Sequence, residues 1–171
     1  FSTLAASLHG GYRVVPQWKL AASAALSTRA PHVNELLTDG IHHGTGTYEV
    51  GNIYLKPEQA LNLSLQSQYT SLNNVFSLDV TLYRNSIKNF IYQQPRPDEP
   101  VLTIRGAFPR IEYRATDALL QGMDITASLQ PHKHLSLTSK YALLHVRNQT
   151  TGDWLIGMPS DRFSNELTYQ L

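Results

Sequence analysis

The feature that most constrains this chain is a two-residue alternation of apolar and polar side chains that recurs along most of its length. It is clearest at 61–66, where leucines alternate with Asn, Ser and Gln. Successive side chains of a β-strand point to opposite faces, so this period predicts strands with one apolar and one polar face. The predicted strands cover about 1–15, 18–29, 54–69, 76–92, 108–129, 135–147 and 158–171. The sequence therefore predicts an all-β fold.

The connections between the predicted strands alternate in length. Short turns lie near Pro16, Asn73 and Pro131, and longer loops lie at 30–53, 94–107 and 148–157. Three prolines between 95 and 100 argue against a central strand in the second of these loops. In an antiparallel up-and-down meander, alternate connections lie at the same end, and short turns opposite long loops are typical of transmembrane barrels. We therefore expect about seven strands of a larger transmembrane β-barrel.

Composition limits the other classes of protein. The formal net charge is only +1, so nucleic acid is not an expected partner. The chain has no cysteine and no apolar run of about 18 residues, so we expect neither disulfides nor a transmembrane helix. Nothing in the sequence calls for a cofactor. Both ends lie inside alternating patterns, so we expect 1–171 to be one domain fragment of something larger.

The stretch 30–53 is the longest interval without alternation, and we expect it to be an extracellular loop. A loop this long usually has a function, and this one holds three of the seven histidines. The candidate ligand-binding residues are His32, Glu35, His42, His43 and Tyr48. His42 and His43 are the candidate metal ligands, with Glu35, Asp39 or Glu49 as oxygen partners. The alternative is that these side chains only shape the loop.

Two further sets of polar residues lie outside this loop. His132 and His134 flank a short turn and are expected to be solvated. Six charged side chains are expected on polar strand faces, where a hydrated interior with ion pairs is favoured over a binding site for an anionic ligand; they are Arg84, Lys88, Arg110, Glu112, Arg114 and Asp124.

An ordered set of short motifs resembles the barrel of TonB-dependent outer-membrane receptors. The residues that carry the resemblance are Arg29-Ala-Pro31, Asn34-Glu-Leu36, Gly40-Ile-His-His-Gly-Thr45, Thr47-Tyr-Glu-Val-Gly-Asn52 and Leu55-Lys-Pro-Glu58, followed by Tyr83-Arg-Asn85, Ile87-Lys-Asn-Phe-Ile91, Thr116-Asp-Ala118, Gly122-Met-Asp124 and Met158-Pro-Ser-Asp-Arg162. The resemblance covers nearly the whole chain. The family's plug domain and TonB-contacting segment have no counterpart in it.

The resemblance implies a receptor in the outer membrane of a Gram-negative bacterium. Such a receptor binds a scarce extracellular ligand, such as a metal, a metal chelate or haem, and imports it with energy from the TonB complex. Its implied partners are outer-membrane lipid, a small ligand and, through parts outside this chain, TonB. Two alternatives remain open at this point: a soluble β-sandwich that binds a ligand such as carbohydrate, and an outer-membrane enzyme with its reactive groups on loops. An enzymatic role is not expected, since no nucleophile–base motif is present.

Overall fold

The computed structural model describes residues 3–170, and almost all of them lie in one nine-stranded sheet. Seven long strands match the seven predicted segments, and two short strands and a five-residue helix lie in the loop at 30–53. The elements are β1 (Ala5–Val15), β2 (Trp18–Arg29), α1 (Val33–Leu37), β3 (Asp39–His42), β4 (Thr47–Val50), β5 (Glu58–Thr70), β6 (Phe76–Thr103), β7 (Gly106–His132), β8 (Leu135–Asn148) and β9 (Arg162–Tyr169). The all-β prediction is confirmed.

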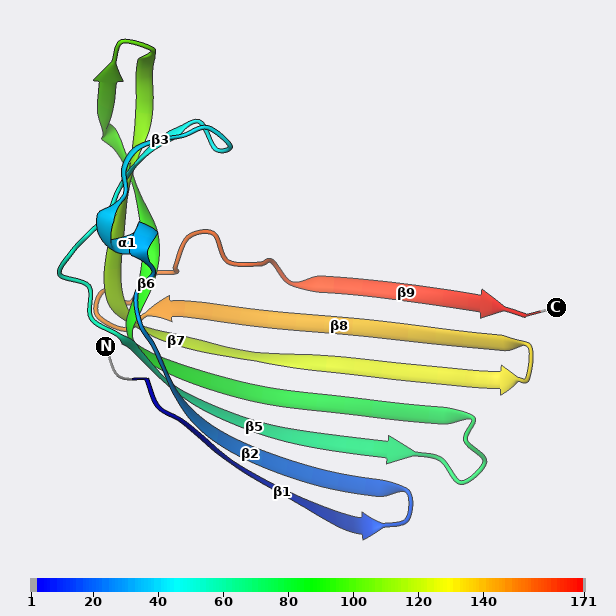
Figure 1. Cartoon of the computed structure of the whole chain (residues 1–171). Coiled ribbons are helices and arrows are strands. Elements are labelled where there is room, and N and C mark those ends of the chain that lie inside the picture. The colour runs from blue at the N-terminus through cyan, green and yellow to red at the C-terminus, as the bar shows by residue number, and fades with distance from the viewer. Residues whose placement is uncertain (1–2, 171) are drawn as a thin grey trace.

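The long strands form the predicted antiparallel meander in the order β1-β2-β5-β6-β7-β8-β9. The short turns β1–β2, β5–β6 and β7–β8 lie together at one end of the sheet, on the right in Figure 1, and the longer connections lie at the other end. In the β5–β6 turn Asn74 adopts a positive φ of 56°, which Asn tolerates better than most residues. The predicted asymmetry between the two ends is therefore confirmed.

The strand register brings the apolar side chains onto one face. Leu26 lies opposite Leu61, and Leu65 lies opposite Leu82, which in turn lies opposite Met123. Residues that face each other across a strand pair point to the same side of the sheet, so these leucines form one continuous apolar face. They remain exposed, Leu61 to 40% and Leu8 to 76%.

The other face carries mainly hydroxyl, amide and charged groups. The Ser23 and Ser64 hydroxyls lie 2.7 Å apart, and the Gln68 side chain donates to Asp79 over 2.7 Å. Arg84 and Lys88 do not belong to this face, contrary to the prediction. Arg84 lies opposite Leu63, and the side chains of Arg84 and Lys88 are exposed on the apolar side of β6.

The single sheet is incompatible with the soluble β-sandwich that the alternation also allowed. A sandwich needs two sheets that bury their apolar faces against each other. Within residues 3–170 all nine strands belong to one sheet, and its leucines face outward. No helix in this range is long and apolar enough to cross a membrane.

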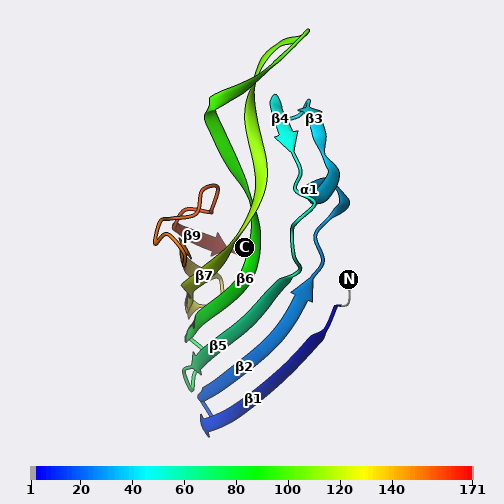
Figure 2. The same ribbon diagram turned by 90° about the vertical axis from the view of Figure 1, so that its left-hand side faces the viewer.

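The β6–β7 hairpin extends far beyond the rest of the sheet, as Figures 1 and 2 show. The prediction that prolines end the strand near residue 94 is wrong, because β6 continues to Thr103 and leaves only a two-residue turn before β7. β6 pairs with β5 only up to Lys88, so Pro95 lies on a strand with one free edge, where proline is tolerated. Register shifts between Ile87 and Phe90 and between Arg96 and Val101 interrupt the ladder.

A small hydrophobic core forms where the long connections leave the sheet. Its buried members are Ala118 on β7, Val146 on β8 and Leu155 in the β8–β9 connection. The Leu155 backbone N–H donates to the Val146 carbonyl over 3.2 Å, which folds this connection back onto β8. The loop end of the sheet is therefore an ordered, packed surface.

Candidate functional site

The loop at 30–53 is fixed at its base by an ion-pair cluster. Arg29, the last residue of β2, donates to Glu58 over 2.8 Å and to Glu35 of α1 over 3.1 Å. Glu35 also accepts the backbone N–H of His32, and Glu58 accepts that of Ile91 on β6. The two carboxylates are largely buried and share one guanidinium, so α1 is held against the end of β2 and the start of β5.

The second half of the loop wraps around the end of α1. The Gly51 N–H donates to the Thr38 carbonyl over 2.7 Å, and the Asn52 N–H donates to the Glu35 carbonyl over 2.8 Å. A Cβ at Gly51 would lie 2.7 Å from the Leu36 carbonyl group, which is closer than side chains approach a backbone. Glycine is therefore required at this position for the loop to close on the helix.

The β3–β4 hairpin reaches across to β7, where β4 forms the one parallel strand pair of the described residues. Tyr48 pairs with Arg110, and Val50 pairs with Glu112. This part of β7 has no β8 neighbour, because β8 pairs with β7 only from Ala118 onward. β4 therefore covers an edge of β7 that would otherwise be open.

A buried carboxylate holds this contact in place. Glu49 is only 7% exposed, and its carboxylate accepts the Tyr113 hydroxyl of β7 over 3.2 Å. The Gln93 amide of β6 donates to the Tyr113 oxygen over 2.9 Å and to Glu49 over 3.5 Å. Burial, together with the negative charge of Glu49, raises the pKa of Tyr113 above its usual value. The phenol is therefore the hydrogen-bond donor at neutral pH.

A charged network follows along the β6–β7 extension. Glu112 accepts from Arg96, Arg110 and Arg114 at 2.8–3.1 Å, and Glu99 pairs with Arg110 over 3.2 Å. The Nε atom of Arg110 is buried and has no partner within the described part of the chain. Three arginines against two glutamates leave the network net positive, which favours an anionic ligand.

A hollow of about 400 Å³ lies where the loop meets β7. It is lined by Val50, Gly51 and Asn52 on one side, and by residues 112–115 on the other. The lining combines guanidinium and amide donors with carboxylate and phenol oxygens. Such a surface suits a polar ligand that makes many hydrogen bonds.

The structure brings some of the predicted site residues together and separates others. His42 and Tyr48 share the β3–β4 hairpin, where the His42 ring contacts the Thr45 hydroxyl at 3.0 Å and the Tyr48 hydroxyl donates to Asp39 over 2.9 Å. That hydrogen bond to Asp39 raises the pKa of Tyr48. His43 is exposed in the adjoining turn. His32 and Glu35 lie apart from the hairpin, at the start of α1.

No group of three or more His, Cys, Asp or Glu side chains within residues 3–170 is placed to hold a metal ion. Glu35 is engaged by Arg29. Reasoning from the sequence did not anticipate Gln93 and Tyr113, because they lie 44 and 64 residues along the chain from their partner Glu49 and only the fold brings them there.

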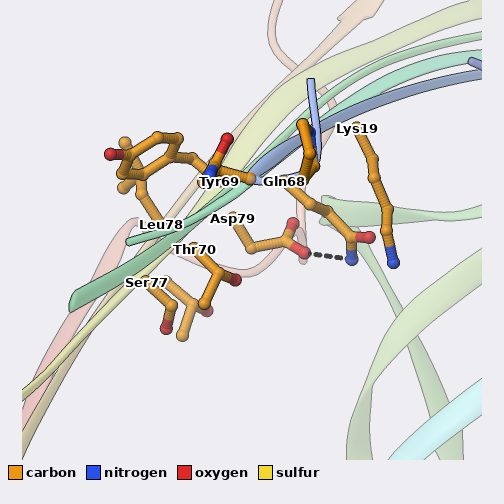
Figure 3. Close-up of a pocket in the computed structure, with 10 residues that line it drawn as sticks. Lys19, Gln68, Tyr69, Thr70, Ser77, Leu78 and Asp79 are labelled. Carbon is orange, nitrogen blue, oxygen red and sulfur yellow. Dashed lines mark hydrogen bonds between the residues drawn. The ribbon is translucent and has the colours of Figure 1, made fainter. Parts of the chain in front are cut away.

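A second hollow of about 400 Å³ lies at the short-turn end of the sheet, on the polar face (Figure 3). Lys19 of β2, Gln68 of β5 and Asp79 of β6 contribute to its lining. Figure 3 shows the Gln68–Asp79 hydrogen bond that crosses between two of these strands. The polar face is thus hollowed at its end opposite the long loops.

Comparison with known proteins gives consistent results. A family model described as "TonB dependent receptor-like, beta-barrel" matches residues 2–171. The iron-regulated outer membrane virulence protein of Vibrio cholerae is 25% identical over 95% of this chain and 26% of its own length. The heme/hemopexin utilization protein C of Haemophilus influenzae is 28% identical over 84% of this chain and 22% of its own length.

Solved structures show the same fold. The structure of the copper transporter OprC covers 98% of this chain with a TM-score of 0.77 at 19% identity, and the match takes in 24% of that transporter. The chain thus spans about a quarter of the length of the relatives that it matches.

Proposed function

Because the chain belongs to the β-barrel family of TonB-dependent receptors, we propose that it forms part of the barrel wall of a receptor in the outer membrane of a Gram-negative bacterium. The whole receptor binds a scarce extracellular ligand, such as a metal, a metal chelate or haem, and imports it with energy from the TonB complex. TonB acts through parts of the receptor outside this chain.

The observation that carries the proposal is the division of the sheet into two unlike faces. An exposed row of leucines costs free energy in water, about 25 cal/mol for each Å² of apolar surface, but none in hydrocarbon. The opposite face carries polar groups that suit a hydrated interior. The apolar face therefore supports contact with lipid, and the end with the long loops supports an extracellular orientation.

The loop at 30–53 and the β6–β7 extension are the parts that we propose to contact the ligand. They form the net positive surface around Arg110 and Glu112 and enclose the hollow beside Gly51. The names of two relatives refer to iron and to haem, so ferric chelates and haem are the first ligands to test. The matching family is one of TonB-dependent receptors, which supports a role without enzymatic activity.

The test is uptake by the complete receptor in a Gram-negative host, with and without a functional TonB complex. We expect the receptor in the outer-membrane fraction and accumulation of radiolabelled ferric chelate or haem only when TonB is functional. A receptor found in the soluble fraction, or uptake that is independent of TonB, would contradict the proposal.

The loop histidines and Tyr48 are proposed as ligand contacts in the same receptor. The paired substitution His42→Ala/His43→Ala is expected to weaken ligand binding about tenfold, the size of one lost charge-assisted or metal contact. His132→Ala/His134→Ala, at the opposite end of the sheet, is the matched control. Equal affinity in the two variants would show that the loop histidines do not touch the ligand.

A further inference from the structure

The outward face of the sheet changes character near the long-loop end. Along β5 and β6 the row Leu65–Leu82 is apolar, whereas the next three rows on this face pair Leu63 with Arg84, Leu61 with Ser86 and Gln59 with Lys88. Further along the same face, Gln121 of β7 lies between Arg84 and His145 of β8, and Arg147 follows two residues later. The apolar face therefore ends in a cationic strip, defined as Arg84, Lys88 and Arg147.

None of the three cations of this strip forms an ion pair within residues 3–170. Arg84 has only Leu63 and Gln121 directly opposite it. Arg147 stacks its guanidinium 5.0 Å from the centre of the Trp154 ring. Arg29, Arg96, Arg110 and Arg114 at the loop end pair with carboxylates, whereas these three cations are open to an external anion.

An apolar groove adjoins the strip. It has a volume of about 340 Å³ and a floor that includes Leu4, just before β1, together with Leu26 of β2 and Leu61 of β5. Its rim includes Lys88 and Ser86 of β6. The groove is thus apolar along one side and carries a cation and a hydroxyl at its upper edge. An amphiphile with an acyl chain and an anionic headgroup has the same division.

The position of Arg84 points to an anion in the membrane itself. A lipid-facing Arg costs about 2–4 kcal/mol at the middle of a bilayer and about 0–1 near its surface. Arginine and lysine at the edge of an apolar band extend their charged ends toward the headgroups. Arg84 on β6 and Arg147 on β8 are separated by β7 and are offset by two residues along the strands. Adjacent strands are about 4.8 Å apart and residues advance about 3.3 Å along a strand, so the two residues lie within about 12 Å of each other.

We propose that the cationic strip and the groove bind one phosphate-bearing, acylated lipid of the outer leaflet. Arg84, Lys88 and Arg147 contact the phosphates, and an acyl chain lies along Leu26 and Leu61. This inference rests on the proposed function, because it requires the apolar face to lie in the outer membrane. A lipid is favoured over free phosphate because the cations border an apolar groove, and inorganic phosphate has no apolar part that could occupy it.

The experiment uses the complete receptor purified in detergent and native mass spectrometry with a diphosphorylated, acylated glucosamine disaccharide as the probe. We expect the wild-type receptor to retain one molecule of the probe. Arg84→Gln and Lys88→Gln should each weaken retention about tenfold and their combination about a hundredfold, because each removes one charge-assisted contact to phosphate. The wild-type receptor should retain the dephosphorylated probe as poorly as the double variant retains the phosphorylated probe.

Matched substitutions separate a specific site from general charge. Arg105→Gln at the tip of the β6–β7 hairpin and Lys133→Gln in the β7–β8 turn remove the same charges elsewhere, and both should leave retention unchanged. Leu61→Ser should weaken retention, while Leu65→Ser, two rows away from Leu61 and outside the groove, should not. Equal losses for Lys133→Gln and Lys88→Gln, or inorganic phosphate competing as strongly as the lipid, would overturn the inference.

Fractionation of the wild-type receptor distinguishes failure of the lipid site from failure of the proposed function. A receptor that lies in the outer membrane but retains the probe equally well in the double variant refutes the lipid site alone. A receptor that does not enter the outer membrane refutes the proposed function.

Discussion

Replacing Tyr113 by phenylalanine in the complete receptor should release the β3–β4 hairpin from β7. The substitution removes the hydroxyl that donates to Glu49 over 3.2 Å and accepts from Gln93 over 2.9 Å. The ring remains, so the change is confined to one polar atom. Glu49 is then left with the Gln93 contact of 3.5 Å, which is long for a hydrogen bond.

The size of the effect follows from the burial of Glu49. A hydrogen bond to a charged group contributes about 1.5–3 kcal/mol, and an unsatisfied buried carboxylate loses that contribution in full. Since 1.4 kcal/mol is a factor of ten, the undocked population of the hairpin should rise about 10- to 150-fold. Only three residue pairs join β4 to β7, so little else opposes release.

Amide hydrogen exchange measures this population directly. The N–H groups of Thr47–Val50 should exchange faster in the variant by the same factor, while those of Glu58–Thr70 in β5 should be unchanged. Tyr54→Phe is the control, because Tyr54 is 83% exposed. Unchanged exchange in β4, or an equal acceleration in β5, would refute the argument.

Three further outcomes are expected. Gly51→Ala should destabilise the closed loop by about 1–3 kcal/mol through its clash with Leu36, measured as faster exchange around α1. Arg29→Met should cost about 1–3 kcal/mol, because it leaves Glu58 without its guanidinium, and should lower the temperature of thermal unfolding. The pKa of Tyr113 is raised in the folded state, so the contribution of its hydroxyl to hairpin docking is present below the usual tyrosine pKa of about 10 and is lost as pH rises through the raised value. Tyrosinate absorbance and hairpin mobility, measured together across this pH range, will follow the loss.

Each of these outcomes has a control. Gly40→Ala should be neutral, since a Cβ there meets nothing within 4 Å. Arg105→Met removes an exposed arginine at the hairpin tip and should leave thermal unfolding unchanged. In Tyr113→Phe the alkaline step in hairpin mobility should disappear. A step that persists in this variant would assign the effect to another group.

The meander could be predicted from the sequence because its cause is local. Each long strand has one apolar and one polar face, so the alternation is present within every strand, as at 61–66. The short turns were found for the same reason, since Pro16 and Asn74 act on their own backbone.

The prediction failed where pairing partners are distant or absent. Proline excludes a residue from a central strand, but Pro95 lies beyond the end of β5, where the strand has a free edge. The sequence around Tyr48 gives no sign that β4 will pair with β7, because the pairing depends on an edge that β8 leaves open. The proposed ligand contacts at His42 and His43 stay predictions.

The parallel pairing of β4 with β7 also sets an order of assembly. The meander is built from neighbouring hairpins, whose contacts are close in sequence and can form as each strand follows the last. Tyr48 can meet Arg110 only after β5, β6 and the outer half of β7 are in place, and contacts so far apart in sequence form late because the entropy of closing the loop must first be overcome. The docking of the loop at 30–53 onto β7 is therefore expected to follow the formation of the hairpins of the meander.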